Sequence, residues 1–328
     1  MRAFVVTEAD DTLTIEVQDI EATPRDPSDL LIAVDYSGVN FKDAMVAALK
    51  SRVRRLPSLV GGVDAAGTVV HSTDPTLPEG TRVVVHGGVV GVARDGGFAQ
   101  FTYSPARYVT ALPESVSTRV AMIVGTAGFT ALESLMALED HGLEKGSEVL
   151  VTGATGGVGS LAVAFLAAKG YLPVASTGSA KESQWLIDRG ARRVIGRDDV
   201  ADNPGRVLAT ETWAGAIDCV GGETLAQILR SLRYGAAVAA SGLVASAELV
   251  TTVYPFITRS VALLGIDSVE ATKVTRERVW SAIGLIVSQI DFESLVDREI
   301  RLEELPEAFD DVRNGTTRGR ILVNPTPG

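Results

Sequence analysis

The sequence predicts an α/β protein with two domains, a small β-barrel followed by a doubly wound parallel sheet. Short β-rich runs separated by proline and glycine fill the first third of the chain. From about Arg119 onward, apolar strands alternate with helical stretches, which is the pattern of βαβ units. The length of 328 residues also fits two domains of about 150 residues each.

The predicted barrel begins near the N-terminus. Residues 13–17 alternate polar and apolar side chains with the period of two that a half-buried strand requires. Proline and glycine signals separate four further β-rich runs, at residues 30–34, 64–70, 82–86 and 98–103. Several short strands joined by glycine-rich turns favour a barrel over an open sheet.

Strands and helices alternate in the second predicted domain. The strands are expected at residues 148–152, 172–177, 193–195, 216–220 and 236–241. The helices are expected at residues 157–169, 180–189 and 223–232. This order predicts a parallel sheet with crossover helices.

The end of the chain mixes a helix, expected at residues 302–314, with a closing strand at residues 319–323. We therefore expect residues 1–118 to form the barrel domain, completed by residues 292–328. Residues 119–291 are expected to form the parallel-sheet domain.

Composition excludes several classes of protein. Lys and Arg number 30 against 41 Asp and Glu, so the net charge of −11 argues against nucleic-acid binding, which requires basic residues. A single cysteine, Cys219, can form neither an internal disulfide nor a four-cysteine zinc site. We find no signal-peptide core and expect no window of about 18 apolar residues, the length that spans a membrane. These features predict a cytoplasmic protein without a membrane partner.

A glycine-rich turn joins the first predicted strand of the second domain to a helix. The second and third glycines of the dinucleotide fingerprint fall on Gly156 and Gly159, whereas its first position is Ala154. Such a turn lets the backbone approach a pyrophosphate at the helix N-terminus. The alternative is a tight turn without a ligand. The residues predicted to bind the cofactor here are Ala154, Thr155, Gly156, Gly157, Val158 and Gly159.

The end of the next strand favours NADPH over NADH. An NAD site usually places an acidic residue there to bind the ribose 2′-hydroxyl, but this chain has no acid before Glu182. Hydroxyl groups and a cation suit a 2′-phosphate instead. The predicted contacts are Ser176, Thr177, Ser179 and Lys181, although Lys181 is equally compatible with an ordinary position on a helix surface.

Several blocks along the chain carry a resemblance to a known family. They include Ser37-Gly38-Val39-Asn40-Phe41-Lys42-Asp43-Ala44, Gly62-Val63-Asp64-Ala65-Ala66-Gly67, Gly125-Thr126-Ala127-Gly128-Phe129-Thr130-Ala131 and Tyr254-Pro255-Phe256-Ile257. With the glycine-rich turn, they resemble the medium-chain dehydrogenase/reductase superfamily, and within it the acrylyl-CoA reductase branch of the quinone-oxidoreductase-like proteins. The resemblance implies a GroES-like barrel joined to a Rossmann domain.

The same resemblance implies an enzyme without zinc. Zinc-dependent relatives carry ligands where this chain has Asn40 and Val63, and the four-cysteine structural loop is missing. The histidines His71, His86 and His141 lie too far apart in sequence to show metal-ligand spacing. We predict no metal site.

The resemblance also implies roles for individual residues. Asn40, Lys42 and Asp43 would lie near the nicotinamide and the substrate, with Thr126 and Thr130 beside the cofactor. Many relatives have Tyr where this chain has Phe41, which cannot donate a proton, so the acid of the reaction stays open. Three loops would line the dinucleotide groove, and Arg320 would reach it or lie exposed. The loop residues are Cys219, Val220, Gly221, Ser241, Gly242, Leu243, Gly265, Ile266 and Asp267.

We expect an NADPH-dependent reductase of the C=C bond in short α,β-unsaturated acyl-CoA thioesters. A basic segment, residues 50–55, would anchor the phosphates of coenzyme A through Arg52, Arg54 and Arg55, unless it is only a solvated run of charge. Alternatives are an NADPH quinone or enone reductase and a non-enzymatic NADPH-binding protein. Relatives usually form homodimers through edge strands, and residues 261–266 are the candidate for that contact.

Overall fold

The computed structural model describes residues 1–201 and 206–326, and these divide into two compact units. The first unit combines residues 1–126 with residues 268–328, and the second comprises residues 127–267. From the sequence, the second unit is expected to begin at residue 119 and to end at residue 291. The first unit extends to residue 126, which is 8 residues beyond the expected residue 118. The second unit ends at residue 267, which is 24 residues before the expected residue 291.

The first unit contains two sheets. A three-stranded sheet has the order β2-β1-β4, and a larger sheet has the order β15-β16-β3-β5-β6-β8, with β7 paired to β3. The closing strand β16 pairs antiparallel with β3, which is how the C-terminal segment completes this unit. The strands are β1 (Arg2–Ala9), β2 (Thr12–Asp19), β3 (Leu30–Gly38), β4 (Ser58–Val60), β5 (Asp64–His71), β6 (Arg82–His86), β7 (Phe101–Ser104), β8 (Val109–Ala111), β15 (Val296–Ile300) and β16 (Arg320–Val323).

Helices close the ends of the first unit. They are α1 (Phe41–Val46), α7 (Lys273–Ile286) and α8 (Leu305–Asn314), with 3₁₀ turns at Ala106–Tyr108, Val287–Gln289, Glu293–Leu295 and Leu302–Glu304. Helix α7 explains why the second boundary lies earlier than expected, because Trp280 donates a hydrogen bond from Nε1 to Nε2 of the buried His86 at 3.1 Å. Arg276 also donates to the His86 carbonyl at 2.6 Å, so this helix belongs with the barrel.

An aromatic cluster forms the core under α1 and α8. The ring of Phe4 meets those of Phe98 and Phe309 edge-on, at centroid separations of 6.0 and 5.7 Å. Ala44 and Ala47 from the buried side of α1 join the same cluster. Such rings contribute both buried apolar area and favourable geometry, so α1 rests on a well-packed base.

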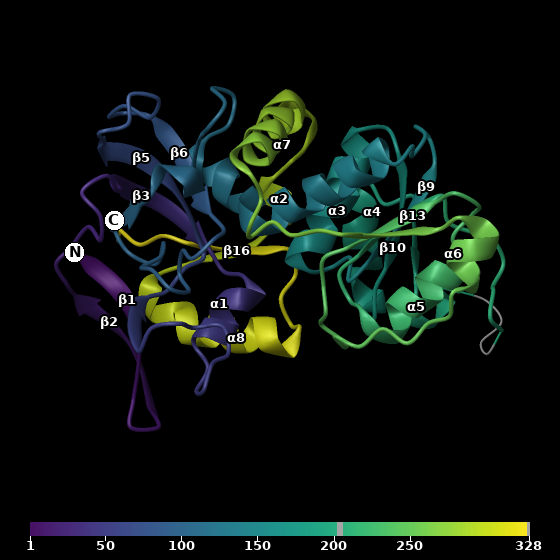
Figure 1. Cartoon of the computed structure of the whole chain (residues 1–328), viewed down its shortest axis with the longest axis horizontal. Helices are drawn as coiled ribbons and strands as arrows, with labels where there is room; N and C mark the ends of the chain where they lie inside the picture. The colour runs from purple at the N-terminus through teal and green to yellow at the C-terminus, as the bar shows by residue number, and fades with distance from the viewer. Residues whose placement is uncertain (202–205, 327–328) are drawn as a thin grey trace. The chain divides into compact units, whose positions relative to one another are not determined.

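The second unit is a six-stranded parallel sheet with the order β11-β10-β9-β12-β13-β14. Figure 1 shows α3 and α4 on one side of these strands and α5 on the other, as a doubly wound sheet requires. The strand order reverses between β9 and β12, which is the point where such sheets bind ligands. The elements are β9 (Glu148–Thr152), α3 (Gly157–Ala168), β10 (Leu172–Ser176), α4 (Ser183–Asp188), β11 (Arg193–Ile195), β12 (Gly215–Asp218), α5 (Gly222–Ser231), β13 (Ala237–Ala240), α6 (Tyr254–Arg259) and β14 (Ala262–Gly265), with 3₁₀ turns at Ala180–Glu182 and Arg197–Asp199.

Strand β14 lies at one edge of this sheet and carries the half-exposed Leu263. The strand through which the sequence predicts pairing with a second copy is therefore an edge strand of the sheet. A homodimer through this edge stays a prediction.

One expectation about membranes was wrong. Helix α2 (Thr118–Asp140) contains an 18-residue window with a mean hydropathy of 1.5, which is long and apolar enough to cross a membrane by composition. However, 78% of that window is buried inside the protein, and Gly125 interrupts the helix with a φ of 49°. Burial on all sides accounts for this apolar composition.

Candidate active site

The glycine-rich turn joins β9 to α3 in the second unit. The Gly156 amide donates to the Gly153 carbonyl at 3.0 Å, and Gly153 has a φ of +60°, which favours glycine. A Cβ at Gly159 would collide with the Gly153 carbonyl, so the helix can pack this closely only without a side chain. No side chain caps the N-terminus of α3. This end therefore fits the phosphates of a dinucleotide, which helix amides and the helix dipole attract.

A buried aspartate holds the loop that follows β12. Asp218 accepts hydrogen bonds from Thr152 Oγ1 at 2.5 Å and from the Gly221 amide at 2.8 Å. The Val220 amide also donates to it, and the Cys219 amide donates to Thr152 Oγ1 at 3.2 Å. The sequence analysis missed Thr152 and Asp218 as positioning residues. The signal for Asp218 was an acidic residue at the end of an apolar strand, three residues before Gly221.

The loops after β13 and β14 continue the same edge. The Ser241 amide donates to the Asp218 carbonyl at 3.0 Å, and a Cβ at Gly242 would collide with the Cys219 backbone. The Ile266 amide donates to the Ala240 carbonyl at 3.1 Å. The structure therefore brings the three predicted loops, residues 219–221, 241–243 and 265–267, to the carboxyl ends of adjacent strands.

Cys219 itself is unsuited to nucleophilic chemistry. Burial, with a smaller contribution from the negative charge of Asp218, raises the pKa of its thiol to about 12. The thiol therefore stays protonated at neutral pH and cannot supply a thiolate.

The hydroxyl groups at the end of β10 have partners within the protein. Ser176 Oγ donates to the Gly196 carbonyl at 3.3 Å, and Thr177 Oγ1 accepts from the Ser179 amide at 3.1 Å. Lys181 lies exposed in the turn before α4. The predicted phosphate contacts thus lie close together in the chain after β10. Ser176 and Thr177 form hydrogen bonds that stabilise this loop, and Lys181 supplies its positive charge.

Sequence reasoning missed a second cation at this place. Arg197 lies two residues after the end of β11, and its guanidinium packs over Gly178, where any Cβ would collide with it. The Arg197 side chain is exposed. Because β10 and β11 are parallel neighbours, Arg197 and the loop after β10 lie at the same edge of the sheet. The signal was an arginine two residues beyond the third strand.

In the first unit, Asp43 holds two chain segments together. Its carboxylate accepts hydrogen bonds from the Asn40 amide at 2.8 Å and from the Val63 amide at 2.8 Å. Burial, with a smaller contribution from the charge of Asp64, raises the pKa of Asp43 to about 7. Asp43 therefore shapes the site and changes its charge near neutral pH.

Asp64 is the centre of a buried polar cluster. One carboxylate oxygen accepts from Asn40 Nδ2 at 3.0 Å and from the Thr126 amide at 2.9 Å. The Arg320 guanidinium donates to Asn40 Oδ1 at 3.2 Å, and its Nη2 lies 3.9 Å from the Asp64 carboxylate. A Cβ at Gly125 would lie 2.7 Å from the Asp64 carboxylate. The absence of a side chain at this kink of α2 therefore leaves room for Asp64. The structure thus brings Asn40, Thr126 and Arg320 together in the first unit.

Arg320 is not exposed, which was one of its two predicted placements. Its side chain is 2% exposed, and it donates to the backbone carbonyls of Ile123 and Val39, each at 3.1 Å. These bonds fasten the closing strand to α2 and to the segment before α1. A contact between Arg320 and the cofactor stays a prediction.

The residues of this cluster do not fit a zinc ion. Val63 has no ligand atom in its side chain, and a buried guanidinium lies beside Asp64, where a second cation would be repelled. Across residues 1–201 and 206–326, no three His, Cys, Asp or Glu side chains gather as metal ligands would.

The remaining predicted residues lie at the edges of these sites. Phe41 is exposed and Lys42 half-buried at the start of α1, and Thr130 is buried in the part of α2 that belongs to the second unit. Within the basic segment, Arg52 and Arg55 are exposed. Arg54 cannot bind a substrate phosphate as predicted, because its side chain is 4% exposed and pairs with Glu8.

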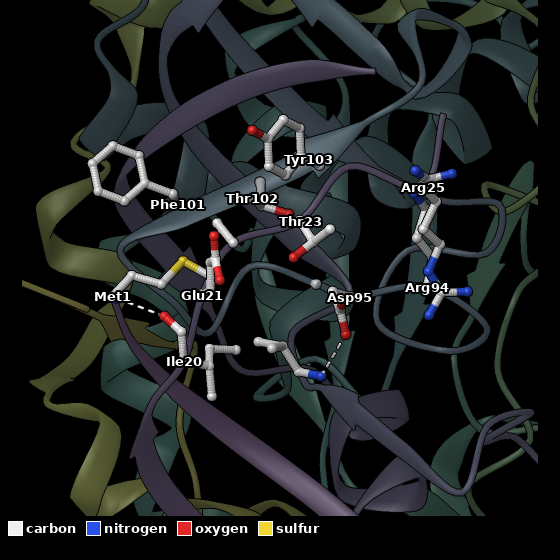
Figure 2. A pocket seen from close by; sticks show the side chains of 13 residues that line it. Met1, Ile20, Glu21, Thr23, Arg25, Arg94, Asp95, Phe101, Thr102 and Tyr103 are labelled. Carbon is white, nitrogen blue, oxygen red and sulfur yellow. Dashed lines mark hydrogen bonds between the residues drawn. The ribbon is translucent and has the colours of Figure 1, made fainter. Parts of the chain in front are cut away.

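A small cavity elsewhere in the first unit is unrelated to these residues. Figure 2 shows its lining, which includes Met1, Arg25, Arg94 and Thr102. Its volume of about 30 Å³ has room for about one water molecule. None of the predicted site residues lines it.

Two family descriptions match the chain. Residues 26–114 match the "Alcohol dehydrogenase GroES-like domain", and residues 157–284 match the "Zinc-binding dehydrogenase" family. The first match lies within the barrel unit, and the second covers most of the parallel sheet. The sequence expectation of a GroES-like domain joined to a Rossmann domain is confirmed.

Similar proteins cover almost the whole chain. A Bacillus subtilis protein named as a quinone oxidoreductase, YhfP, is 43% identical over 95% of both chains. Acrylyl-CoA reductase AcuI of Ruegeria pomeroyi is 43% identical over 94% of this chain and 93% of its own. The crystal structure of the YhdH oxidoreductase from Salmonella enterica in complex with NADP has a TM-score of 0.93 at 38% identity, covering 99% of this chain and 100% of that one.

These likenesses confirm the predicted enzyme class, an oxidoreductase, and the similar structures with bound NADP or NADPH support the predicted cofactor, NADPH. The glycine-rich turn and the cations after β10 and β11 agree with that cofactor. The chain belongs to the medium-chain dehydrogenase/reductase superfamily, in the branch that contains acrylyl-CoA reductases and quinone oxidoreductases.

Proposed function

We propose that this enzyme reduces the C=C bond of short α,β-unsaturated acyl-CoA thioesters, acrylyl-CoA being the type substrate. The observation that carries the proposal is the cluster of Asn40, Asp64 and Arg320, whose side chains leave no place for a metal that would polarise an alcohol or ketone. An alkene conjugated to a thioester needs no such metal, because its own carbonyl accepts the electrons. The 43% identity to an acrylyl-CoA reductase supports the same substrate class.

Residues of the second unit would hold the cofactor. The turn at Gly156 and the N-terminus of α3 bind the pyrophosphate, and Lys181 with Arg197 binds the 2′-phosphate. NADPH, when bound, supplies the hydride that is added to the β-carbon of the substrate. Asp218 keeps the neighbouring loop in a single conformation, which lowers the entropy cost of binding.

Residues around Asn40 would orient the acyl group. Hydride addition places negative charge on the thioester oxygen, and the Lys42 ammonium is the donor in this segment that can stabilise that charge. Asn40 is held in place by Asp64 and Arg320, so the orientation of its side-chain amide is fixed. Phe41 has no proton to give, so the proton that reaches the α-carbon comes from solvent water.

Quinone reduction is the second candidate. The 43% identity to YhfP, which is named as a quinone oxidoreductase, favours it specifically. The two activities share the hydride donor and differ in the acceptor, so assays with both kinds of substrate distinguish them.

Parallel assays separate the candidates. Purified enzyme is offered acrylyl-CoA, crotonyl-CoA and a small quinone, and NADPH oxidation is followed in each, with NADH as a control. We expect kcat/KM to be highest for acrylyl-CoA with NADPH. Turnover of the quinone alone would replace the proposal by the second candidate, and NADPH binding without oxidation of any substrate would favour a non-enzymatic role.

A further inference from the structure

We propose that the exposed side of α1 and the turn after it form a binding track for the coenzyme A part of the substrate. The track consists of Phe41, Met45 and Leu49, followed by Arg52 and Arg55. It rests on the proposed function, because it assigns the position of the acyl carrier of that same substrate.

The first half of the track is apolar and solvent-exposed. Phe41 and Met45 lie one helical turn apart on α1, and Leu49 follows in the turn after the helix. These side chains are 41%, 39% and 48% exposed, whereas Ala44 and Val46 on the other side are buried. A row of exposed apolar side chains beside a candidate catalytic segment is a surface that an extended, mostly uncharged chain would cover.

Side-chain hydrogen bonds hold the segment that carries this row. Arg54 donates to the Val46 carbonyl at 2.6 Å, and Arg313 donates to the Ala44 carbonyl at 2.7 Å. Ser51 Oγ donates to the Met45 carbonyl at 2.7 Å. Together these bonds satisfy carbonyls at the C-terminal end of α1, which a helix leaves without partners. A ligand on this surface therefore meets a site that needs no ordering when it binds.

The second half of the track is basic, and the structure divides its cations by role. Arg54 forms an ion pair with Glu8, and Lys50 forms an ion pair with Asp11 at 3.2 Å. The exposed Arg52 and Arg55 are the guanidiniums that face solvent in this segment. A planar guanidinium binds phosphate through two parallel hydrogen bonds.

A hollow of about 350 Å³ adjoins one of these cations, Arg55. Arg55, Lys50 and Arg54 line it together with Glu8, Asp10 and Asp11. Glu8 and Asp11 are paired with Arg54 and Lys50, which leaves Asp10 as the unmatched acid of the lining. The basic charge available to a phosphate is therefore concentrated on Arg52 and Arg55.

The order of chemistry along the track matches that of a coenzyme A thioester. The reacting acyl group lies at one end, near Asn40. A long arm with few charges follows, and the phosphates lie at the far end. The apolar row and the two exposed arginines occur in this same order along the chain. The positive charge of the arginines is opposite to that of the phosphates.

Two double variants test the track in the full-length enzyme. Arg52→Ala with Arg55→Ala removes the phosphate contacts, and Met45→Ser with Leu49→Ser removes the apolar row. Each is assayed with acrylyl-CoA and with acrylyl-pantetheine, which carries no phosphate. We expect the arginine variant to raise KM about tenfold for acrylyl-CoA and to leave KM for acrylyl-pantetheine unchanged. The apolar variant should raise KM for both thioesters.

Matched controls come from exposed residues outside the track. Arg192→Ala and Leu285→Ser, the latter 80% exposed on α7, should leave both KM values unchanged. An unchanged KM for acrylyl-CoA in the arginine variant, or equal rises for both thioesters, would overturn the track.

A binding measurement keeps this test separate from the test of the proposed function. Absence of turnover of either thioester by the unmodified enzyme would count against the proposed function. Calorimetric titration with coenzyme A alone then still decides the track. Affinity about tenfold weaker in the arginine variant would support it, and equal or undetectable binding in both proteins would overturn it.

Discussion

Replacement of Arg320 by methionine is expected to lower the free energy of unfolding by about 3–5 kcal/mol, the cost of removing one partner of a buried ion pair. The side chain is 2% exposed and lies beside two buried carboxylates, Asp43 and Asp64. Methionine fills much of the same volume but leaves that negative charge uncompensated. It also removes the hydrogen bonds that Arg320 donates to the carbonyls of Val39 and Ile123.

The loss should depend on pH in a defined direction. The pKa of Asp43 is raised from 3.8 to about 7, so the folded protein binds this proton more tightly than the unfolded chain does. The resulting stabilisation is complete below pH 3.8 and is lost as the pH rises through 7. Removal of Arg320 should therefore cost less at pH 5, where Asp43 is protonated and neutral, than at pH 8, where both carboxylates are charged.

Urea unfolding of both proteins at pH 5 and pH 8 measures this effect. Arg192→Met replaces an exposed arginine and should change the free energy of unfolding by less than about 0.5 kcal/mol. A loss below about 1 kcal/mol for Arg320→Met at both pH values would contradict the assigned role of the cluster.

Replacement of Arg197 by alanine is expected to raise KM for NADPH by about 10- to 100-fold and to leave KM for NADH nearly unchanged. Hydrogen bonds to charged groups contribute about 1.5–3 kcal/mol, which corresponds to that range. Arg197 is exposed and lies over Gly178, at the loop where Lys181 supplies the other positive charge. Its loss should therefore remove affinity for the 2′-phosphate alone.

Steady-state kinetics with each cofactor measures this change. Arg192→Ala removes a cation near the opposite end of β11 and should leave both KM values unchanged. Equal rises in KM for NADPH and NADH would mean that Arg197 supports the loop in general and does not select the cofactor.

The architecture was predictable because its signals are local. Alternation at residues 13–17 and the strand-turn-helix sequence around Gly156 depend on neighbouring residues, and the structure has β2 and the β9–α3 turn at these places. The positions of the three loops after β12, β13 and β14 were predictable for a similar reason. Each follows an apolar strand, and the ends of parallel strands meet at one edge of a sheet.

The residues that were missed or misplaced depend on tertiary contacts. Arg197 became a candidate only when β11 was found beside β10, and Asp218 only when its carboxylate was found between Thr152 and Gly221. Arg54 appeared in sequence as one base of a run, yet its partner Glu8 lies 46 residues away. The apolar window in α2 was overlooked in the sequence. Its burial inside the protein accounts for its apolar composition.

In the proposed reaction, NADPH delivers a hydride to the β-carbon of an enoyl thioester and solvent supplies the proton to the α-carbon. The most direct test is a reaction of acrylyl-CoA with NADPH that carries deuterium at the transferred position, followed by mass and NMR analysis of the product. We expect propionyl-CoA with one deuterium on the β-carbon and a solvent hydrogen on the α-carbon. Deuterium on the α-carbon, or oxidation of NADPH without formation of propionyl-CoA, would contradict it.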